Sequence, residues 1–192
     1  MVQEKDFIRP ELEGLEILIT EEQIQQKVIE IGQAISHDYR ENEGRDLVLI
    51  AMLNGASFFQ TDLLKNIYFD PARLKSDFMR VESYKNSQIP QEPRIVEDTK
   101  SPIGGKDIII VEDIVDSGGT MEATLEMLRT RNPNSLEICS LLSKTEKRKE
   151  ESKDMFVKYL GFEIPDEYVV GYGLDDSKER YRTLRYIGYF PK

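Results

Sequence analysis

The chain has 192 residues, which is enough to bury one substantial core. Its formal net charge of −10 argues against general nucleic-acid binding, and 32% charged residues without a long apolar run exclude a membrane-spanning protein. The N-terminal residues lack the basic and apolar segments of a secretory signal, and the single cysteine, Cys139, cannot form an internal disulfide. We therefore expect a cytoplasmic protein that binds neither nucleic acid nor membranes.

The first half of the chain predicts a helix followed by a strand-loop-helix unit. Residues 20–35 open with a capping box and continue with apolar residues at helical spacing. Residues 47–53 form an uninterrupted apolar run, typical of a strand buried on both faces, and the apolar segment 58–64 continues as a helix. The only histidine, His37, lies off the apolar stripe of the first helix, so a histidine-based catalytic triad is not expected.

A strand and a polar loop are predicted next. Residues 76–83 alternate well enough for a strand, with Phe78 and Val81 as candidates for burial. Residues 84–88 are polar and precede two prolines, a composition typical of a mobile loop.

The most informative stretch runs from residue 107 to residue 120. Its β-branched beginning is typical of a buried strand in a parallel sheet, and ligands of such sheets bind at the C-terminal ends of the strands. Here the strand ends in two adjacent carboxylates, Glu112 and Asp113, followed by a third, Asp116. A loop of small residues then opens a helix: Ser117, Gly118, Gly119 and Thr120. Backbone N–H groups, hydroxyls and a helix N-terminus favour a phosphate, and the carboxylates favour a ligand that also carries sugar hydroxyls and Mg²⁺.

This stretch resembles the phosphoribosyl-pyrophosphate (PRPP) binding motif of the type I phosphoribosyltransferases. That motif reads four apolar residues, two acids, two apolar residues, Asp, two small residues, a variable residue and Thr. The resemblance implies that residues 112 and 113 hold the ribose hydroxyls, directly or through metal-bound water, and that residues 116–120 bind PRPP. It also implies that Asp116 is the catalytic residue, placed to accept or share the proton at N7 of a base.

The resemblance implies an α/β fold with a central, mostly parallel sheet flanked by helices and a small hood subdomain. Residues 1–192 would form a single phosphoribosyltransferase domain. Its core would span about residues 20–160, and its hood would combine the N-terminal segment with about residues 161–192.

Two loops before the central stretch match the hypoxanthine-guanine branch of the family. Leu53, Asn54 and Gly55 stand where that branch has a non-proline cis peptide whose exposed amide contacts pyrophosphate, so they are expected to bind PRPP. Asn54 replaces a residue that is commonly basic, which leaves the backbone role intact and calls a cationic side-chain contact into question. Ser83 and Tyr84 resemble the pair in the flexible loop that closes over the reacting centre and excludes water.

The resemblance also places a base site after the central stretch. Lys144 follows a predicted strand at 135–142, where the family has a lysine that donates to the oxygen at position six of a purine. Residues 161–175 closely match the family run Gly-Phe-Xaa-Ile-Pro-Asp-Xaa-Phe-Val-Val-Gly-Tyr. This match implies that Tyr168 stacks on the purine, that the backbone of Val169 reads the base edge, and that the base-binding segment extends to Asp175.

Three residues near the C-terminus extend the pyrophosphate side of the predicted site. The resemblance implies that Asp175 approaches Mg²⁺ near pyrophosphate, so that the expected metal-side carboxylates are those of Glu112, Asp113 and Asp175. Arg182 matches the family arginine that contacts pyrophosphate. Asp176 stands where an aromatic residue commonly follows the metal-side aspartate, which leaves the local geometry open.

The function implied is transfer of the phosphoribosyl group of PRPP to hypoxanthine, guanine or both, giving IMP or GMP and pyrophosphate in purine salvage. Mg²⁺ is the expected cofactor, PRPP and a 6-oxopurine are the expected substrates, and a homodimer or homotetramer is expected. One alternative is a regulator with this fold that binds nucleic acid. The acidic composition and the retained base-site residues speak against it. Another alternative is a phosphoribosyltransferase for xanthine or uracil.

Overall fold

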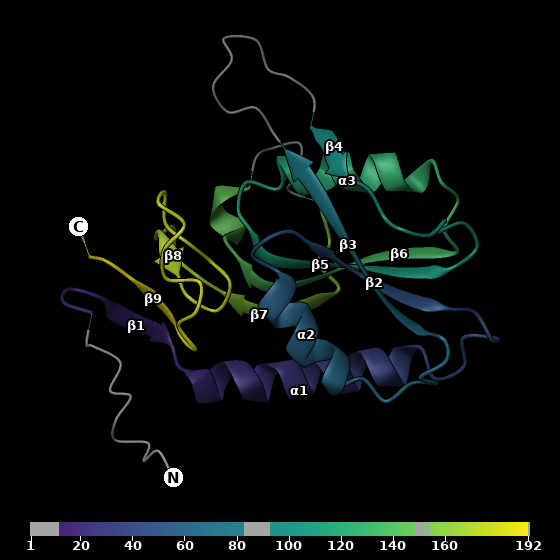
Figure 1. The fold of residues 1–192 in the computed structure, drawn as a ribbon, viewed down its shortest axis with the longest axis horizontal. Coiled ribbons are helices and arrows are strands. Elements are labelled where there is room, and N and C mark those ends of the chain that lie inside the picture. Colours follow the sequence, from purple (N-terminus) through teal and green to yellow (C-terminus); the bar gives the residue numbers. More distant parts are fainter. Residues whose placement is uncertain (1–11, 83–92, 149–151, 153, 192) are drawn as a thin grey trace.

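A computed structural model describes residues 12–82, 93–148, 152 and 154–191 of the protein. Its strands form two sheets (Figure 1). The elements are β1 (Glu16–Ile19), α1 (Glu21–Asp38), β2 (Leu47–Met52), α2 (Ser57–Lys65), β3 (Leu74–Glu82), β4 (Arg94–Glu97), β5 (Asp107–Val115), α3 (Gly119–Arg129), β6 (Ser135–Ser143), the short 3-10 helix η2 (Thr145–Lys147), β7 (Tyr159–Glu163), β8 (Val169–Val170) and β9 (Ile187–Tyr189).

The larger sheet has six strands in the order β4-β3-β2-β5-β6-β7. All neighbouring pairs are parallel except β3 with β4, which confirms the predicted central, mostly parallel sheet flanked by helices. Every residue of β2 is buried, because alternate side chains pack on opposite faces. Leu49 and Ala51 pack in one core with α1 and α2, and Val48 and Ile50 pack in a second core with α3.

The first helix forms as its sequence predicts. The Thr20 hydroxyl accepts a hydrogen bond from the backbone N–H of Gln23 at 3.3 Å, and the Gln23 side chain accepts one from the backbone N–H of Thr20 at 2.9 Å. This capping box satisfies donors that the first helical turn leaves without partners. The His37 side chain is 75% exposed, so the histidine faces solvent as predicted.

The burial predicted for β3 is wrong at Phe78, which is exposed, and Val81 is half-buried. Asp77 is buried instead, because its carboxylate accepts hydrogen bonds from the backbone N–H groups of Lys100 and Phe78, both at 2.9 Å. The hydrogen bond from Lys100, 23 residues further along the chain, therefore helps to determine that the face of β3 with Asp77 is the buried one.

The smaller sheet has the order β1-β9-β8 and combines both ends of the described chain (Figure 1). We call these three strands the hood. β7 belongs to the larger sheet, where it pairs with β6 as far as Glu163. None of the described helices is long and apolar enough to cross a membrane.

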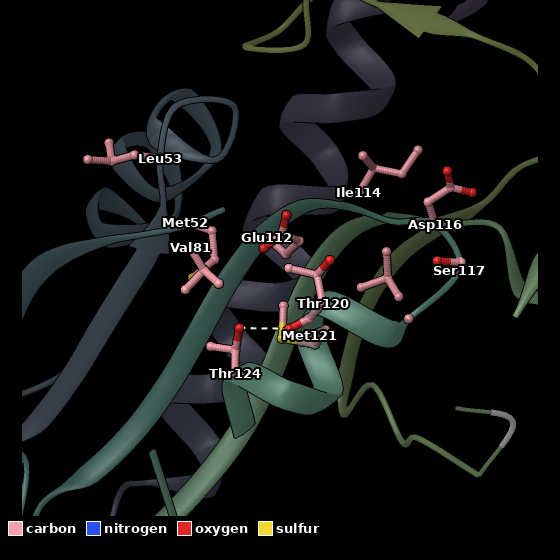
Figure 2. Close-up of a pocket in the computed structure, with 12 residues that line it drawn as sticks. Met52, Leu53, Val81, Glu112, Ile114, Asp116, Ser117, Thr120, Met121 and Thr124 are labelled. Atoms are coloured by element: carbon pink, nitrogen blue, oxygen red, sulfur yellow. Dashed lines mark hydrogen bonds between the residues drawn. The ribbon is translucent and has the colours of Figure 1, made fainter. Parts of the chain in front are cut away.

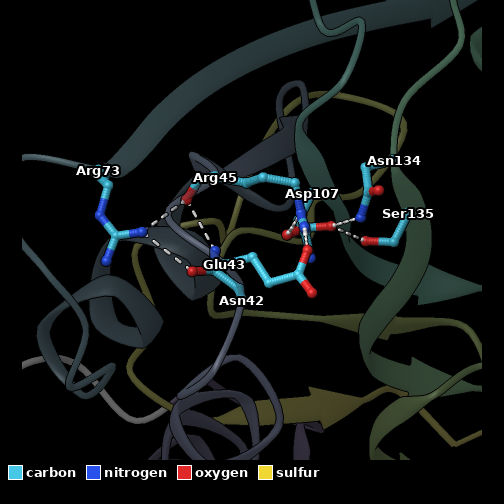
Figure 3. Close-up of polar contacts among 7 residues, drawn as sticks. All are labelled: Asn42, Glu43, Arg45, Arg73, Asp107, Asn134 and Ser135. Carbon is cyan, nitrogen blue, oxygen red and sulfur yellow. Dashed lines mark hydrogen bonds and ion pairs between the residues drawn. The ribbon is translucent and has the colours of Figure 1, made fainter.

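Asp107 begins β5 and lies at the N-terminal ends of the central strands, where it pairs with Leu47 of β2 and Ser135 of β6. Figure 3 shows its side chain with the polar groups around it. Its carboxylate is 3% exposed and accepts hydrogen bonds from Arg45 Nε at 3.1 Å, Asn134 Nδ2 at 2.6 Å and Ser135 Oγ at 2.8 Å. Burial opposes ionisation of this carboxyl, but the three donors outweigh burial and hold its pKa below the ordinary value.

The single cysteine lies in β6 and is fully buried in the core shared with α1 and α2. Burial raises the pKa of the Cys139 thiol well above its ordinary value. The side chain therefore acts as a small apolar residue of the core.

Candidate active site

A cleft of about 320 Å³ opens at the C-terminal ends of β2, β3 and β5, which is the size of a small-molecule site (Figure 2). Met52 and Leu53 contribute from the end of β2, and Val81 from β3. The remaining lining comes from the end of β5, the loop after it and the start of α3: Glu112, Ile114, Val115, Asp116, Ser117, Gly118, Thr120, Met121 and Thr124. The predicted PRPP motif therefore forms most of this cleft.

We call residues 116–120, between β5 and the first turn of α3, the phosphate loop. Its conformation depends on Gly118, the residue that caps α3. Its φ is +84°, a left-handed conformation that favours glycine, and a Cβ here would lie 2.7 Å from Ser152 Cβ. The Gly119 position is open, with nothing within 4 Å of an added Cβ. The loop thus brings the first N–H groups of α3 to the cleft, where a helix N-terminus favours an anion.

The loop at the end of β2 contains a cis peptide bond between Leu53 and Asn54, at the position that the resemblance indicates. Gly55 follows and lies directly against Asp113, because an added Cβ would be 1.5 Å from Asp113 Oδ2. A Cβ at Gly173 would lie 2.1 Å from the carbonyl oxygen of Gly55. The chain segments around residues 55, 113 and 173 therefore pack too closely to leave room for a side chain at either glycine.

Glu112 and Asp113 suit a divalent cation. Loss of water and the neighbouring Asp113 carboxylate raise the pKa of Glu112, and loss of water raises the pKa of Asp113. Asp175, the third predicted metal-side residue, instead forms an ion pair with Arg182 at 2.5 Å. Within the described ranges no three His, Cys, Asp or Glu side chains gather as a metal site. Mg²⁺ is usually bound by one or two carboxylates together with substrate phosphates, so these residues fit a metal that arrives with a phosphate-bearing ligand.

Four charged residues beside the phosphate loop are linked by ion pairs: Lys144, Asp166, Lys147 and Asp116. The backbone N–H of Lys144 donates to the carbonyl of Val115 at 3.0 Å, which places this lysine next to the end of β5. Its side chain is only 8% exposed, and its ammonium lies 3.1 Å from Asp166. Lys147 lies 2.9 Å from the same Asp166 oxygen and 3.3 Å from Asp116, and these carboxylates raise the pKa of Lys147.

The predicted base segment lies in and beside the hood. Val169 is buried in β8, whereas Tyr168 is 63% exposed and its hydroxyl donates to the carbonyl of Asp175 at 3.1 Å. The hydroxyl of Tyr172 donates to Asp62 of α2 at 2.8 Å. This hydrogen bond ties the segment to the larger sheet's helical layer.

Asp176 organises the loop that precedes Arg182. Its carboxylate accepts hydrogen bonds from the backbone N–H groups of Lys178 at 2.9 Å and Arg180 at 3.0 Å, and from the Arg180 guanidinium at 2.8 and 2.6 Å. The guanidinium lowers the pKa of this carboxyl to about 2. Arg182 donates to the carbonyl of Gly173 at 2.6 Å. A carboxylate thus takes the position of the family's usual aromatic residue and forms a compact turn.

The structure brings most of the predicted residues to one end of the larger sheet. Of the predicted residues, those that line the cleft are Leu53, Glu112, Asp116, Ser117, Gly118 and Thr120. Gly55 and Asp113 lie against each other beside it. Ser83 and Tyr84 lie outside the described residues. Sequence reasoning missed Lys147, Asp166 and Arg80, which contact predicted site residues. No sequence pattern marks Arg80, because it contacts Asn54 across 26 positions of the chain.

Comparison with known proteins gives the class. The sequence model of the family described as "Phosphoribosyl transferase domain" matches residues 20–177, and the chain belongs to this family. The curated hypoxanthine-guanine phosphoribosyltransferase of Mycobacterium tuberculosis is 44% identical over 176 residues, covering 90% of this chain and 84% of that protein.

Solved structures agree with this family. A crystal structure of a hypoxanthine phosphoribosyltransferase from Staphylococcus aureus has a TM-score of 0.82 and 43% identity, covering 92% of this chain and 91% of that one. The hypoxanthine phosphoribosyl transferase of Trypanosoma cruzi has a TM-score of 0.85 and 33% identity, with 95% of each chain covered. The fold of this chain is therefore that of the phosphoribosyltransferases.

Proposed function

We propose that the protein is a purine salvage enzyme that transfers the phosphoribosyl group of PRPP to hypoxanthine or guanine and releases pyrophosphate. One observation carries this proposal: Lys144, a nearly buried lysine, lies beside the phosphate loop at the end of the sheet. The Lys144 ammonium, which could donate to a 6-oxopurine, would then lie next to a loop that could bind the phosphate of a ribose. The named relatives, which are hypoxanthine or hypoxanthine-guanine phosphoribosyltransferases, support the same assignment.

The reaction forms a bond between N9 of the purine and C1 of the ribose as the bond from C1 to the pyrophosphate oxygen breaks. Positive charge grows on the ribose, and negative charge grows on the leaving group. The N–H groups of residues 117–120 would bind phosphate, and Glu112 and Asp113 would accept hydrogen bonds from the ribose hydroxyls. Mg²⁺ held by these two acids together with PRPP oxygens would supply positive charge to the leaving pyrophosphate.

Asp116 is the proposed catalytic residue. It lies at the start of the phosphate loop and lines the cleft, with a side chain 43% exposed. From there its carboxylate would accept or share the proton at N7 while N9 attacks. Removal of this group is expected to lower turnover by about 10 to 10⁴ fold, the general acid-base range or slightly below it.

Lys144 is the proposed selector of the base. Its ammonium has three N–H donors, and Asp166 occupies one of them in the described structure. A 6-oxo group accepts such a donor, whereas the 6-amino group of adenine offers another donor. A buried donor that lacks an acceptor is costly, so adenine should be a poor substrate.

The test is turnover of hypoxanthine, guanine, xanthine and adenine, each with PRPP and Mg²⁺, followed by pyrophosphate release. We expect rapid conversion of hypoxanthine or guanine but not of adenine, slowed by Asp116→Asn. Preference for uracil would contradict the purine assignment. Absence of turnover together with PRPP binding would favour a regulator.

The organisation of the molecule is part of the proposal. We infer one phosphoribosyltransferase domain in which the hood carries the base-binding segment, and a homodimer or homotetramer, as is common in this branch of the family. The single buried cysteine supports a reducing, cytoplasmic setting. Light scattering of the purified protein would measure the oligomeric state.

A further inference from the structure

The side chain of Asn54 is held in one orientation by an arginine of the neighbouring strand. Met52 pairs with Met79 at the end of the β2–β3 ladder, and the backbone N–H of Leu53 donates to the carbonyl of Met79 at 2.8 Å. Arg80, the next residue of β3, then donates from Nη2 to Asn54 Oδ1 at 2.9 Å. The backbone of Asn54 is fixed too, because its carbonyl accepts from the Ser57 hydroxyl at 2.8 Å.

This contact determines which way the Asn54 amide faces. A guanidinium has only donors, so the group facing Arg80 must be the amide oxygen. The amide nitrogen, with two N–H donors, therefore points away from Arg80. No described residue accepts a hydrogen bond from this nitrogen, so its donors are available to a ligand.

Arg80 also brings positive charge to the 53–55 loop. Its side chain is 34% exposed, and the only carboxylate paired with it among the described residues is Glu97, at 3.8 Å. Glu97 is 53% exposed, so this pair is weak and leaves most of the charge of Arg80 uncompensated. A cation at the amide oxygen polarises the amide and strengthens its N–H donors toward an anion.

We propose that Arg80 is a positioning residue for pyrophosphate, acting through Asn54. Arg80 orients the Asn54 amide so that its N–H groups donate to the pyrophosphate of PRPP, and it adds nearby positive charge. Together the two residues replace the basic side chain that commonly stands at position 54 in this branch of the family. The inference rests on the proposed function, because it requires a PRPP site at the 53–55 loop.

The test compares Arg80→Gln with Arg131→Gln, which loses the same charge beyond the C-terminal end of α3. Arg131 is 30% exposed and pairs with Asp98, so it matches Arg80 in exposure. The measurements are KM for PRPP, KM for hypoxanthine, and the Kd of Mg²⁺-pyrophosphate by calorimetry. In Arg80→Gln we expect KM for PRPP and Kd for pyrophosphate to rise about tenfold, with KM for hypoxanthine within about twofold. Arg131→Gln should change none of the three.

The double variant Arg80→Gln/Asn54→Lys separates this role from a merely structural one. A lysine at position 54 supplies its own positive charge, so it should restore pyrophosphate binding in the Arg80→Gln background. An unchanged Kd for pyrophosphate in Arg80→Gln would overturn the inference, as would failure of the double variant to recover. Both outcomes concern binding without a base, so they are distinct from failure of the enzyme to convert purines.

Discussion

Lys147 forms an ion pair with Asp116, the proposed catalytic carboxylate, at 3.3 Å. The two side chains are 41% and 43% exposed, so solvent screens the pair and its worth is about 0–1 kcal/mol. Asp116 can therefore leave Lys147 for a base at little cost. We expect Lys147→Gln to lower kcat less than about fivefold, compared with about 10 to 10⁴ fold for Asp116→Asn. Steady-state turnover of hypoxanthine measures both, and equal losses would assign Lys147 a part in the chemistry.

Lys144 and Asp166 predict a graded effect on base binding. Lys144→Gln removes the ammonium proposed to donate to the 6-oxo group, and a hydrogen bond to a charged group is worth about 1.5–3 kcal/mol. We therefore expect kcat/KM for hypoxanthine to fall about 10 to 150 fold, with KM for PRPP unchanged. Asp166→Asn removes only a partner that is 60% exposed, so its effect should be smaller. A rise in KM for PRPP in Lys144→Gln would contradict the assignment of this residue to the base.

Gly55 predicts a steric effect on an acid of the site. The Cβ of Gly55→Ala would overlap the Asp113 carboxylate at 1.5 Å, so that carboxylate must move. We expect kcat/KM for PRPP to fall at least about 100-fold, the scale of a displaced positioning group. The control is Gly105→Ala, where φ is +72° and nothing lies within 4 Å. That variant should lose only about 1–2 kcal/mol of stability and keep its turnover per folded molecule. Normal PRPP kinetics in Gly55→Ala would show that Asp113 is not needed in its present position.

Asp107 predicts acid-sensitive stability. Because its pKa is lower in the folded than in the unfolded chain, its contribution is present above the unfolded value of about 4 and is lost as pH falls through the folded value. Asp107→Asn should lower the free energy of unfolding by about 1–3 kcal/mol at pH 7, and less below pH 4. Urea unfolding across pH measures this. Glu41→Gln is the control, because its side chain is 86% exposed and its ion pair with Arg40 at 3.7 Å should matter by less than about 1 kcal/mol.

Local sequence patterns were sufficient for the buried strands that begin at residues 47, 107 and 135 and for the turn into α3. The apolar run at 47–52 predicts a strand buried on both faces, and the small residues after Asp116 predict a tight turn into α3. These features depend on neighbours in the sequence, so a short motif carries them.

Contacts between distant segments were not predictable in this way. Asp77 is buried because a backbone group of Lys100 reaches it, and this reverses the facing expected for Phe78. The contact between Arg80 and Asn54 likewise depends on the register of β2 with β3. That register exists only once the two strands pair, so the residues around Arg80 do not by themselves indicate the contact.

Because Cys139 is buried, thiol reagents should hardly label the native protein. A fully buried thiol with a raised pKa reacts slowly, so an introduced surface cysteine would be modified selectively. Ile17 in the hood is 56% exposed and Tyr68 beyond α2 is 79% exposed. Spin labels on cysteines introduced at these two positions would measure the distance between the hood and the helical layer of the larger sheet, with and without PRPP. The native cysteine would not have to be replaced first.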